Sequence, residues 1–309
     1  MRKSCRLFRF EVMDEDRHGS FVIGYPTVAA QNSGFLIYRC GGVHQGNEKY
    51  ASAQLSTVPT PIRPTAWMTP RYTSRGITQN MYCHRKGGAV NRRIQASRQN
   101  CTHRCYVAGC ELNGKVFVCG GSNGHERLKS AEIYDAEKNQ WTQLRDMHFA
   151  RSDAAACTMN GRVYVVGGFS GEFVLQSVEM YIPDSDLWIE IATMNTPRSG
   201  LACVVDGDSI VIAGGFDGSA RLSSVERLRS CSSYTMILPS MPSARSNFGM
   251  CKYGDIIYVV GGYAKGVTSS VLQFDGYRWS EVSALNIARS ATKVQSYFCE
   301  MRVLCIPLH

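Results

Sequence analysis

The residues in this sequence with the clearest capacity for binding chemistry are arginines that recur at a regular spacing. Successive members are 47 residues apart three times and 44 residues apart once. A guanidinium group can bind a carboxylate through two parallel hydrogen bonds, so a ring of arginines suits an acidic peptide. The same side chain could instead form a structural ion pair with a glutamate of the repeat. The sequence leaves both uses open for Arg104, Arg151, Arg198, Arg245 and Arg289.

A second set of residues recurs in phase with the arginines and completes a candidate peptide-binding face. Glycine doublets follow the first four arginines, and three of the four residues directly after the doublets are aromatic. Aromatic side chains and arginines often anchor a bound protein. Small polar residues after the arginines could add hydrogen bonds. We therefore predict that a protein segment with an acidic or polar motif is bound by the arginines together with Ser122, Phe169, Phe216, Tyr263, Ser152, Ser199, Ser246 and Asn247.

Histidines and cysteines, the other residues with catalytic or metal-binding potential, do not form a recognisable site. The seven histidines do not recur in phase and form no HxH or HExxH group. The thirteen cysteines include no CxxC pair, and Cys110, Cys157 and Cys251 occupy one repeat position inside a short apolar run. A cysteine in such a run behaves as a small buried hydrophobic residue. We predict no catalytic residue, no metal site, no cofactor and no enzymatic activity.

The formal charge of +9 is concentrated in the first third of the chain. Residues 1–110 hold 16 Lys/Arg and 5 Asp/Glu, whereas residues 111–309 hold 18 and 20. The basic pairs of the first third are scattered among Gly, Asn and Gln, which is unlike the single basic face of a nucleic-acid-binding domain. No apolar run of about 18 residues indicates a membrane span, and no apolar segment follows the basic N-terminus. We predict a cytoplasmic protein that binds neither nucleic acid nor membranes.

The arginines and aromatics are positioned by an internal repeat of 47 residues, the spacing between successive glycine doublets. Each unit holds four short β-type runs, separated by turn residues such as Asn160-Gly161 and Pro183-Asp184. No segment has the 3.6-residue period of a helix. Four antiparallel strands in each repeat predict the blade of a β-propeller in an all-β fold.

The repeat resembles the kelch motif, in which a glycine doublet is followed by Glu-x-Tyr, Trp, Met and Arg. The third unit departs from it, with Leu228 and Thr235 where Tyr and Trp are expected, and the fourth has Gln273 in place of Glu. The Arg-Ser pairs and the Gly-Gly-Phe-Asp-Gly segment at 214–218 are similar to the animal kelch-like family, and to its diablo and kelch-like protein 10 members in particular. We assign a structural role to Gly120, Gly121, Trp141, Gly167, Gly168, Trp188, Gly214, Gly215, Gly261, Gly262 and Trp279.

The resemblance implies a domain organisation. Kelch-like proteins carry BTB and BACK domains before six kelch blades, and neither of those domains is recognisable in this sequence. We count four clear blades and one degenerate blade, which predicts an incomplete kelch β-propeller and a fragment of a longer protein. The predicted segments are an irregular N-terminal part (1–33), a degenerate kelch-like part with an insertion (34–103), the repeat array (104–300) and a tail or closing strand (301–309).

The resemblance also implies a function. A kelch-like propeller is the substrate-recognition module of a cullin-3 ubiquitin ligase adaptor, and cullin-3 itself binds through the BTB–BACK region. An actin-binding scaffold is the alternative, since some family members contact F-actin. A kelch-fold copper oxidase is a remote third possibility, because it needs paired histidines and a Cys–Tyr partnership that this sequence does not supply.

Overall fold

The described structure of this chain is built from β-strands. The computed structural model describes residues 104–135, 138 and 140–291, together with the short strands that lie outside these ranges. The described elements are strands and one 3-10 turn, Pro183–Ser185. Within the described residues, no helix has the length and apolar character that crossing a membrane would need. The all-β prediction is confirmed.

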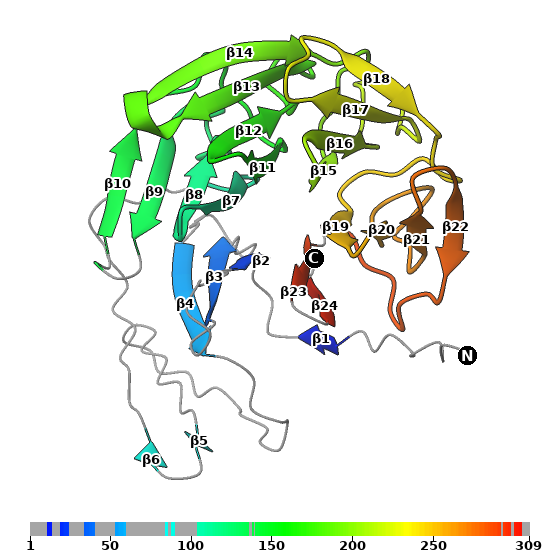
Figure 1. Ribbon diagram of the computed structural model, residues 1–309, viewed down its shortest axis with the longest axis horizontal. Helices are drawn as coiled ribbons and strands as arrows, with labels where there is room; N and C mark the ends of the chain where they lie inside the picture. The colour runs from blue at the N-terminus through cyan, green and yellow to red at the C-terminus, as the bar shows by residue number, and fades with distance from the viewer. Residues whose placement is uncertain are drawn as a thin grey trace.

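Four antiparallel sheets of four strands form the blades predicted from the repeat (Figure 1). The first blade holds β7 (Ala108–Leu112), β8 (Lys115–Cys119), β9 (Ala131–Asp135) and β10 (Gln140–Leu144). The second holds β11 (Ala155–Met159), β12 (Arg162–Val166), β13 (Ser177–Ile182) and β14 (Leu187–Thr193). The third holds β15 (Ala202–Asp206), β16 (Ser209–Ala213), β17 (Val225–Arg229) and β18 (Thr235–Leu238). The fourth holds β19 (Gly249–Tyr253), β20 (Ile256–Val260), β21 (Val271–Phe274) and β22 (Trp279–Val282).

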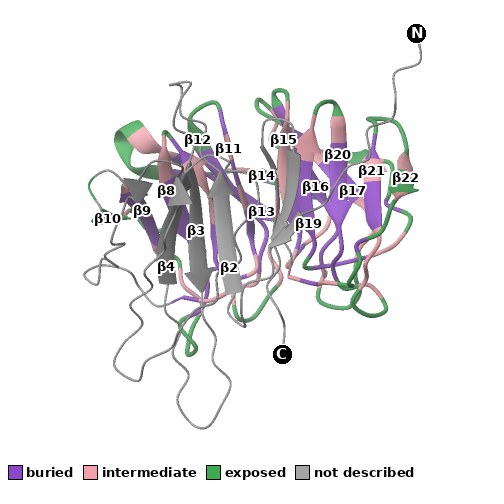
Figure 2. Ribbon diagram, turned by 90° about the horizontal axis from the view of Figure 1, so that it is seen from below, coloured by how far each residue is buried: buried purple, intermediate pink, exposed green. Residues whose placement is uncertain are grey.

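Within each blade, the first strand lies nearest the centre and the fourth lies at the rim (Figure 1). The second strands are apolar on both faces and buried on both, and all five residues of β16 are buried. The rim strands are more polar and more exposed, so that β10 exposes three of its five residues. Figure 2 shows this gradient, with buried residues in the interior of the sheets and exposed residues on the loops and the rim. The core therefore lies between successive blades.

Two further sheets of three strands each occupy the space between the fourth blade and the first. One consists of β2 (Gly19–Gly24), β3 (Gly34–Cys40) and β4 (Ala53–Pro59), and the other of β23 (Lys293–Tyr297), β24 (Glu300–Leu304) and β1 (Glu11–Met13). β24 pairs with β23 in antiparallel orientation and with β1 in parallel orientation. A short hairpin, β5 (His84–Arg85) and β6 (Gly88–Ala89), lies apart from both sheets (Figure 1).

These two sheets correct the predicted count and the predicted break in the ring. β2 contacts both β7 and β23, and β23 contacts β19, so the inner strands follow one another around a closed ring of six sheets. The N-terminal part predicted to be irregular (1–33) contributes β1 and β2, whose apolar runs carry no kelch motif. The segment 34–103 contributes β3 to β6. Trp67 and Met68, within the part predicted to be a degenerate repeat, lie outside the described residues.

The glycine doublets allow each blade to approach the next. The eight doublet glycines have φ between +57° and +106°, a range that disfavours residues with a Cβ. A Cβ on Gly214 would lie 2.6 Å from the carbonyl oxygen of Arg245 in the following blade and 2.7 Å from the ring of Phe248. The structural role predicted for the doublets rests on this contact.

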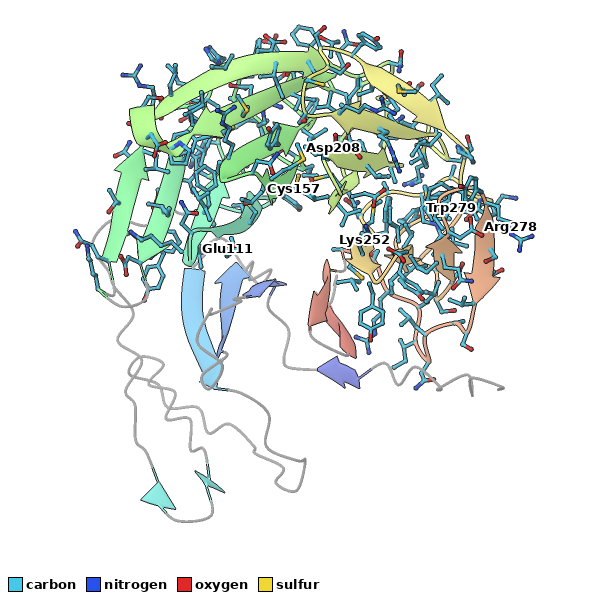
Figure 3. All side chains as sticks on the ribbon, viewed as in Figure 1. Glu111, Cys157, Asp208, Lys252, Arg278 and Trp279 are labelled. Atoms are coloured by element: carbon cyan, nitrogen blue, oxygen red, sulfur yellow. The ribbon has the colours of Figure 1, made fainter. Side chains whose placement is uncertain are left out.

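The tryptophans join the outer strands of neighbouring blades. The indole nitrogen of Trp188 donates to the carbonyl of Arg145 at 2.8 Å, and Trp279, near the rim in Figure 3, donates to Pro239 at the same distance. Both acceptors belong to the preceding blade. Trp141 is buried and lies 5.1 Å from the ring of Tyr134. In the third blade Thr235 stands at this position; its hydroxyl donates to Glu226 of the same blade and accepts from the Asn195 side chain of the preceding blade at 3.0 Å.

Replacing Gly214 with alanine tests the close approach between blades. We expect the free energy of unfolding to fall by about 1–3 kcal/mol more than it does for Gly207→Ala, because overpacking adds to the backbone cost. Gly207 is the matched control, since it lies in the same blade at φ +63° and a Cβ there would meet nothing within 4 Å. Urea unfolding of the two variants measures the difference. Equal losses would show that contact with the next blade is not the constraint.

Candidate functional site

The recurrent arginines are buried where each blade meets the one before it. Arg104, Arg151, Arg198 and Arg245 expose at most 1% of their surface. The main chain of Arg151 is bonded to the first blade, because its N–H donates to Leu128 at 3.0 Å and its carbonyl accepts from Gly121 at 2.8 Å. The side chain reaches into the second blade, where it donates to the carbonyl of Gly167 at 2.8 Å and to Glu179 at 2.5 Å.

The same ion pair occurs in the first three blades and involves a glutamate on the third strand. Arg104 pairs with Glu132, and Arg198 pairs with Glu226 at 2.6 Å. The carboxylates also accept N–H groups from the preceding blade, from His148 to Glu179 and from Asn195 to Glu226, both at 2.8 Å. The recognition role predicted for these arginines is therefore corrected to a structural one, because their charges are neutralised and their side chains have no accessible surface.

The fourth blade lacks this carboxylate. Arg245 is bonded to neutral groups only: the carbonyls of Gly261 and Ser270 and the hydroxyls of Ser243 and Ser270. Gln273, at the glutamate position, donates to Ser280 at 3.1 Å. Burial lowers the pKa of Arg245, and the negative charge of Glu281 opposes that shift. Arg289 is only half-buried, so its side chain differs from those of the other four arginines.

The hydrogen bonds around Glu226 keep this buried carboxylate charged. Burial is the largest single influence on its pKa and acts to raise it. Hydrogen bonds from Thr235, Arg198 and Asn195 together outweigh burial and hold the pKa below its ordinary value of 4.5. A carboxyl group with a lowered pKa stabilises the fold above that ordinary value and loses this contribution as the pH falls.

The predicted serines are held inside the loops of the face. Ser122, Ser152 and Ser246 are buried, and Ser199 is half-buried. The Ser122 hydroxyl donates to the carbonyl of Glu126 at 3.0 Å and accepts from Arg127 at 2.9 Å. The Ser199 hydroxyl donates to the carbonyl of Phe216 at 3.3 Å. These side chains shape the loops, and the buried ones offer little surface to a ligand.

The residues after the doublets lie on one face and start small hairpins that project from it. Each pairs backward with the loop that precedes the first strand and forward with a residue further along its own loop. In the second blade these partners are Ser152 and Val174. Phe169 and Phe216 are half-buried, and 36% of Tyr263 is exposed. The structure thus brings the predicted aromatics together on the face, without the arginines.

Two other arginines, which were not among the predicted site residues, lie beside the aromatic rings of this face. The guanidinium of Arg221 lies 4.3 Å from the ring centroid of Tyr263, and that of Arg127 lies 5.4 Å from Phe169. In both pairs the arginine comes from the hairpin of one blade and the ring from the next, which is a cation–π arrangement. Each arginine is the sixth residue after the second glycine of a doublet. This shared phase was a signal that could have identified them.

A chain of main-chain hydrogen bonds links the blades at the start of their first strands. It runs through the residues two positions after each arginine, from Asp153 N to Tyr106 O, Gly200 N to Asp153 O, Asn247 N to Gly200 O and Ala291 N to Asn247 O, at 2.7–3.0 Å. All five have φ between +53° and +59°. We call Tyr106, Asp153, Gly200, Asn247 and Ala291 the inner ring. Asn247 was predicted as a contact residue and is exposed here.

The cysteines on the inner and second strands are packing groups. Cys157 lies on β11 near the centre (Figure 3), and the free cysteines include Cys110, Cys119 and Cys251. Burial raises the pKa of Cys119 and of Cys251 to about 12, so these thiols stay protonated and unreactive. Within the described residues, no three His, Cys, Asp or Glu side chains are grouped as metal ligands.

Comparison with known proteins identifies the repeat. The KLHDC2/KLHL20/DRC7 Kelch-repeats domain matches residues 76–215, and the Kelch motif matches residues 197–242 and 244–286. Together these matches extend over more than half of the chain. The solved structure titled "Structure of YjhT" has a TM-score of 0.60 and 13% sequence identity, and the match covers 90% of this chain and 87% of that one. This likeness supports the propeller fold alone.

Sequence relatives match over one part of the chain. A Kelch repeat and BTB domain-containing protein of Caenorhabditis elegans is 47% identical over 57 residues, which are 17% of this chain and 10% of that protein. The Kelch repeat-containing protein kel-10 of the same organism is 44% identical over 57 residues, with the same coverage. Kelch-like protein 4 of Homo sapiens is 40% identical over 48 residues, 16% of this chain and 7% of that protein. The matched segment thus spans a tenth or less of each relative.

Replacing Glu226 with glutamine tests the buried ion pair. At neutral pH we expect the free energy of unfolding to fall by about 3–5 kcal/mol, because Arg198 is left as an uncompensated buried charge. The difference from the wild type should shrink as the pH falls below about 4.5, since protonation removes the same charge from Glu226. Urea unfolding at pH 7 and pH 4 measures both effects. Exposed Glu190, on β14, is the control, and its glutamine variant should change stability little.

Replacing Gln273 with glutamate tests the missing carboxylate of the fourth blade. We expect a gain of about 1.5–3 kcal/mol at pH 7, the range for a hydrogen bond to a charged group. The gain should disappear in acid, because the new carboxylate would have a lowered pKa beside Arg245. Gln273→Met is the uncharged control. A loss of stability at pH 7 would show that the surroundings of Arg245 cannot accept a carboxylate.

Proposed function

Because this chain is a kelch-repeat protein with a β-propeller fold, we propose that it binds a segment of another protein. The binding surface is the face that carries the inner ring and the hairpins after the glycine doublets. The observation that carries this proposal is the set of rings held on that face, Phe169 and Tyr263 under their arginines and Tyr106 with 62% of its surface exposed. Tyrosine and arginine are both enriched among the residues that carry most of the binding energy at protein interfaces.

The face is ordered before any partner binds, and this supports a recognition role. Main-chain bonds fix Tyr263 to Ser246 on one side and to Val267 on the other. The stacked Arg221 limits the conformations of both side chains. A surface whose anchors are already held loses less conformational entropy on binding, which leaves more of the contact energy as affinity.

We propose further that the partner is a substrate of protein ubiquitination. The resemblance to kelch-like adaptors of the diablo and kelch-like protein 10 type supports this role, as does the similarity to a BTB domain-containing relative. In such adaptors the BTB–BACK region binds cullin-3 and the propeller binds the substrate in the cytoplasm. This chain would supply the second activity. Within the described residues, no observation favours actin binding or oxidase chemistry over it.

We do not propose that the bound segment is acidic, as the arginine repeat had led us to predict. That prediction rested on Arg151, Arg198 and Arg245 as an accessible basic collar, and these side chains are buried. Reversing their charge would unfold the propeller and would not report on binding. Arg127 and Arg221, which lie on the hairpins, are more suitable cations for such tests.

Replacing Tyr263 with alanine tests the proposed face. Peptides selected by the wild-type chain from a random display library should bind Tyr263→Ala at least about tenfold more weakly, because a ring at the centre of an interface is lost. Affinity is measured by fluorescence anisotropy. Tyr277→Ala is the matched control, since Tyr277 is in the same blade, is 86% exposed and lies in the turn between β21 and β22, at the opposite end of the strands. Equal affinities for Tyr263→Ala and wild type would exclude this face.

A further inference from the structure

Arg221, on the hairpin after the third glycine doublet, is held on the proposed face by stacking alone. Its guanidinium lies 4.3 Å from the ring centroid of Tyr263 in the fourth blade. The residue is exposed, and within the described part of the chain its side chain forms no hydrogen bond and no ion pair. The ring of Tyr263 therefore covers one face of the guanidinium, and the other face is left to solvent.

Arg127, at the same position of the first blade, shows why Arg221 is not bonded to its own hairpin. The Ser122 hydroxyl accepts a hydrogen bond from Arg127 at 2.9 Å, and Arg127 is half-buried. The residue after the doublet in the third blade is Phe216, whose side chain has no acceptor. One difference within the repeat thus leaves the guanidinium of Arg221 without a partner in its own loop.

The surroundings of Arg221 favour an uncharged partner group over an acidic one. Asp217, on the same hairpin, accepts two main-chain N–H groups at 2.7 Å and the Ser219 hydroxyl at 2.9 Å. The main-chain bonds are the main cause that lowers the pKa of its carboxyl, so the hairpin already carries a negative charge. A second carboxylate would approach a charge of its own sign. Val267, which pairs with Tyr263 and is 46% exposed, adds apolar surface beside the stack.

A guanidinium that already lies on one ring is a suitable surface for a second ring. The group is more weakly hydrated than an ammonium, and it stacks on aromatic faces. The negative face of an aromatic ring attracts the cation. Because Tyr263 holds the plane of Arg221 in one orientation, a second ring can stack on it with little further loss of side-chain entropy.

We propose that Arg221 selects an aromatic side chain of the partner segment, which stacks on the face of the guanidinium opposite Tyr263. Ring, cation and ring then form one stack on the hairpins of the third and fourth blades. The inference rests on the proposed peptide-binding function and names the class of side chain that the face selects. Phenylalanine, tyrosine and tryptophan share the required ring.

Selection from a random peptide display library compares the wild-type chain with Arg221→Lys. Lysine keeps the positive charge but has no planar group to stack. The wild-type chain should therefore enrich an aromatic residue at one position, and Arg221→Lys should lose that enrichment. Arg278→Lys is the matched control and should keep it, since the Arg278 side chain is 85% exposed and lies in the turn between β21 and β22, at the opposite end of the strands.

Affinities for one selected peptide and for its leucine counterpart, measured by fluorescence anisotropy, complete the test. Arg221→Lys should weaken the aromatic peptide about fivefold, or about 1 kcal/mol, and should change the affinity of the leucine peptide little. A loss confined to the aromatic peptide reports the stack itself, because a general disturbance of Tyr263 would weaken both peptides.

Three results would overturn the inference and leave the proposed function standing. The first is equal loss of affinity for both peptides. The second is a set of peptides that need Tyr263 but show no aromatic enrichment. The third is enrichment of aspartate or glutamate that persists in Arg221→Lys, because the partner would then recognise the charge and not the plane. A folded wild-type chain that selects no peptide would overturn both the inference and the proposed function.

Discussion

A guanidinium group buried between two β-sheets must be neutralised and hydrogen-bonded, and the geometry of the propeller follows from how this requirement is met. The main chain of Arg151 is bonded to one blade while its side chain is bonded to the next. Breaking either set would leave a charge or a carbonyl unpaired in a low-dielectric interior, at a cost of several kcal/mol. The arginine therefore fixes both the spacing of two blades and their rotation about the axis.

Other features of the repeat belong to the same contact between successive blades. The carbonyl of the arginine occupies the space above a doublet glycine, so only a residue without a Cβ fits there. The glutamate that meets the guanidinium also accepts main-chain N–H groups from the preceding blade. In the fourth blade, Gln273 and Pro242 stand in place of the acid and of one donor position. The fourth blade therefore lacks both the carboxylate and the main-chain N–H group that would bond to it, as expected if the acid and its donor form one structural unit.

Because the repeated arginines are buried between the blades, they are not available to a partner on the face. The surface that remains is made of rings, hairpin tips and the inner ring of left-handed residues. Two of the cations on its hairpins, Arg127 and Arg221, are stacked on rings of the following blade. The chemistry of the face is thus set by single positions that differ from blade to blade, while the repeated positions maintain the scaffold.

The sequence by itself determined the period, the four strands in each blade and the buried role of the doublets and of Trp188, because these depend on local spacing and side-chain volume. It also contained both partners of the Arg–Glu pair, but it left two uses of Arg151 open. Only the tertiary structure decided between them, since exposure depends on how far one blade lies from the next. The two three-stranded sheets were missed for a related reason: β2 and β24 carry no repeat motif, and their place is set by long-range pairing and contacts. The inner ring was missed for the same reason, because it is formed by main-chain hydrogen bonds between residues about 47 apart in the chain.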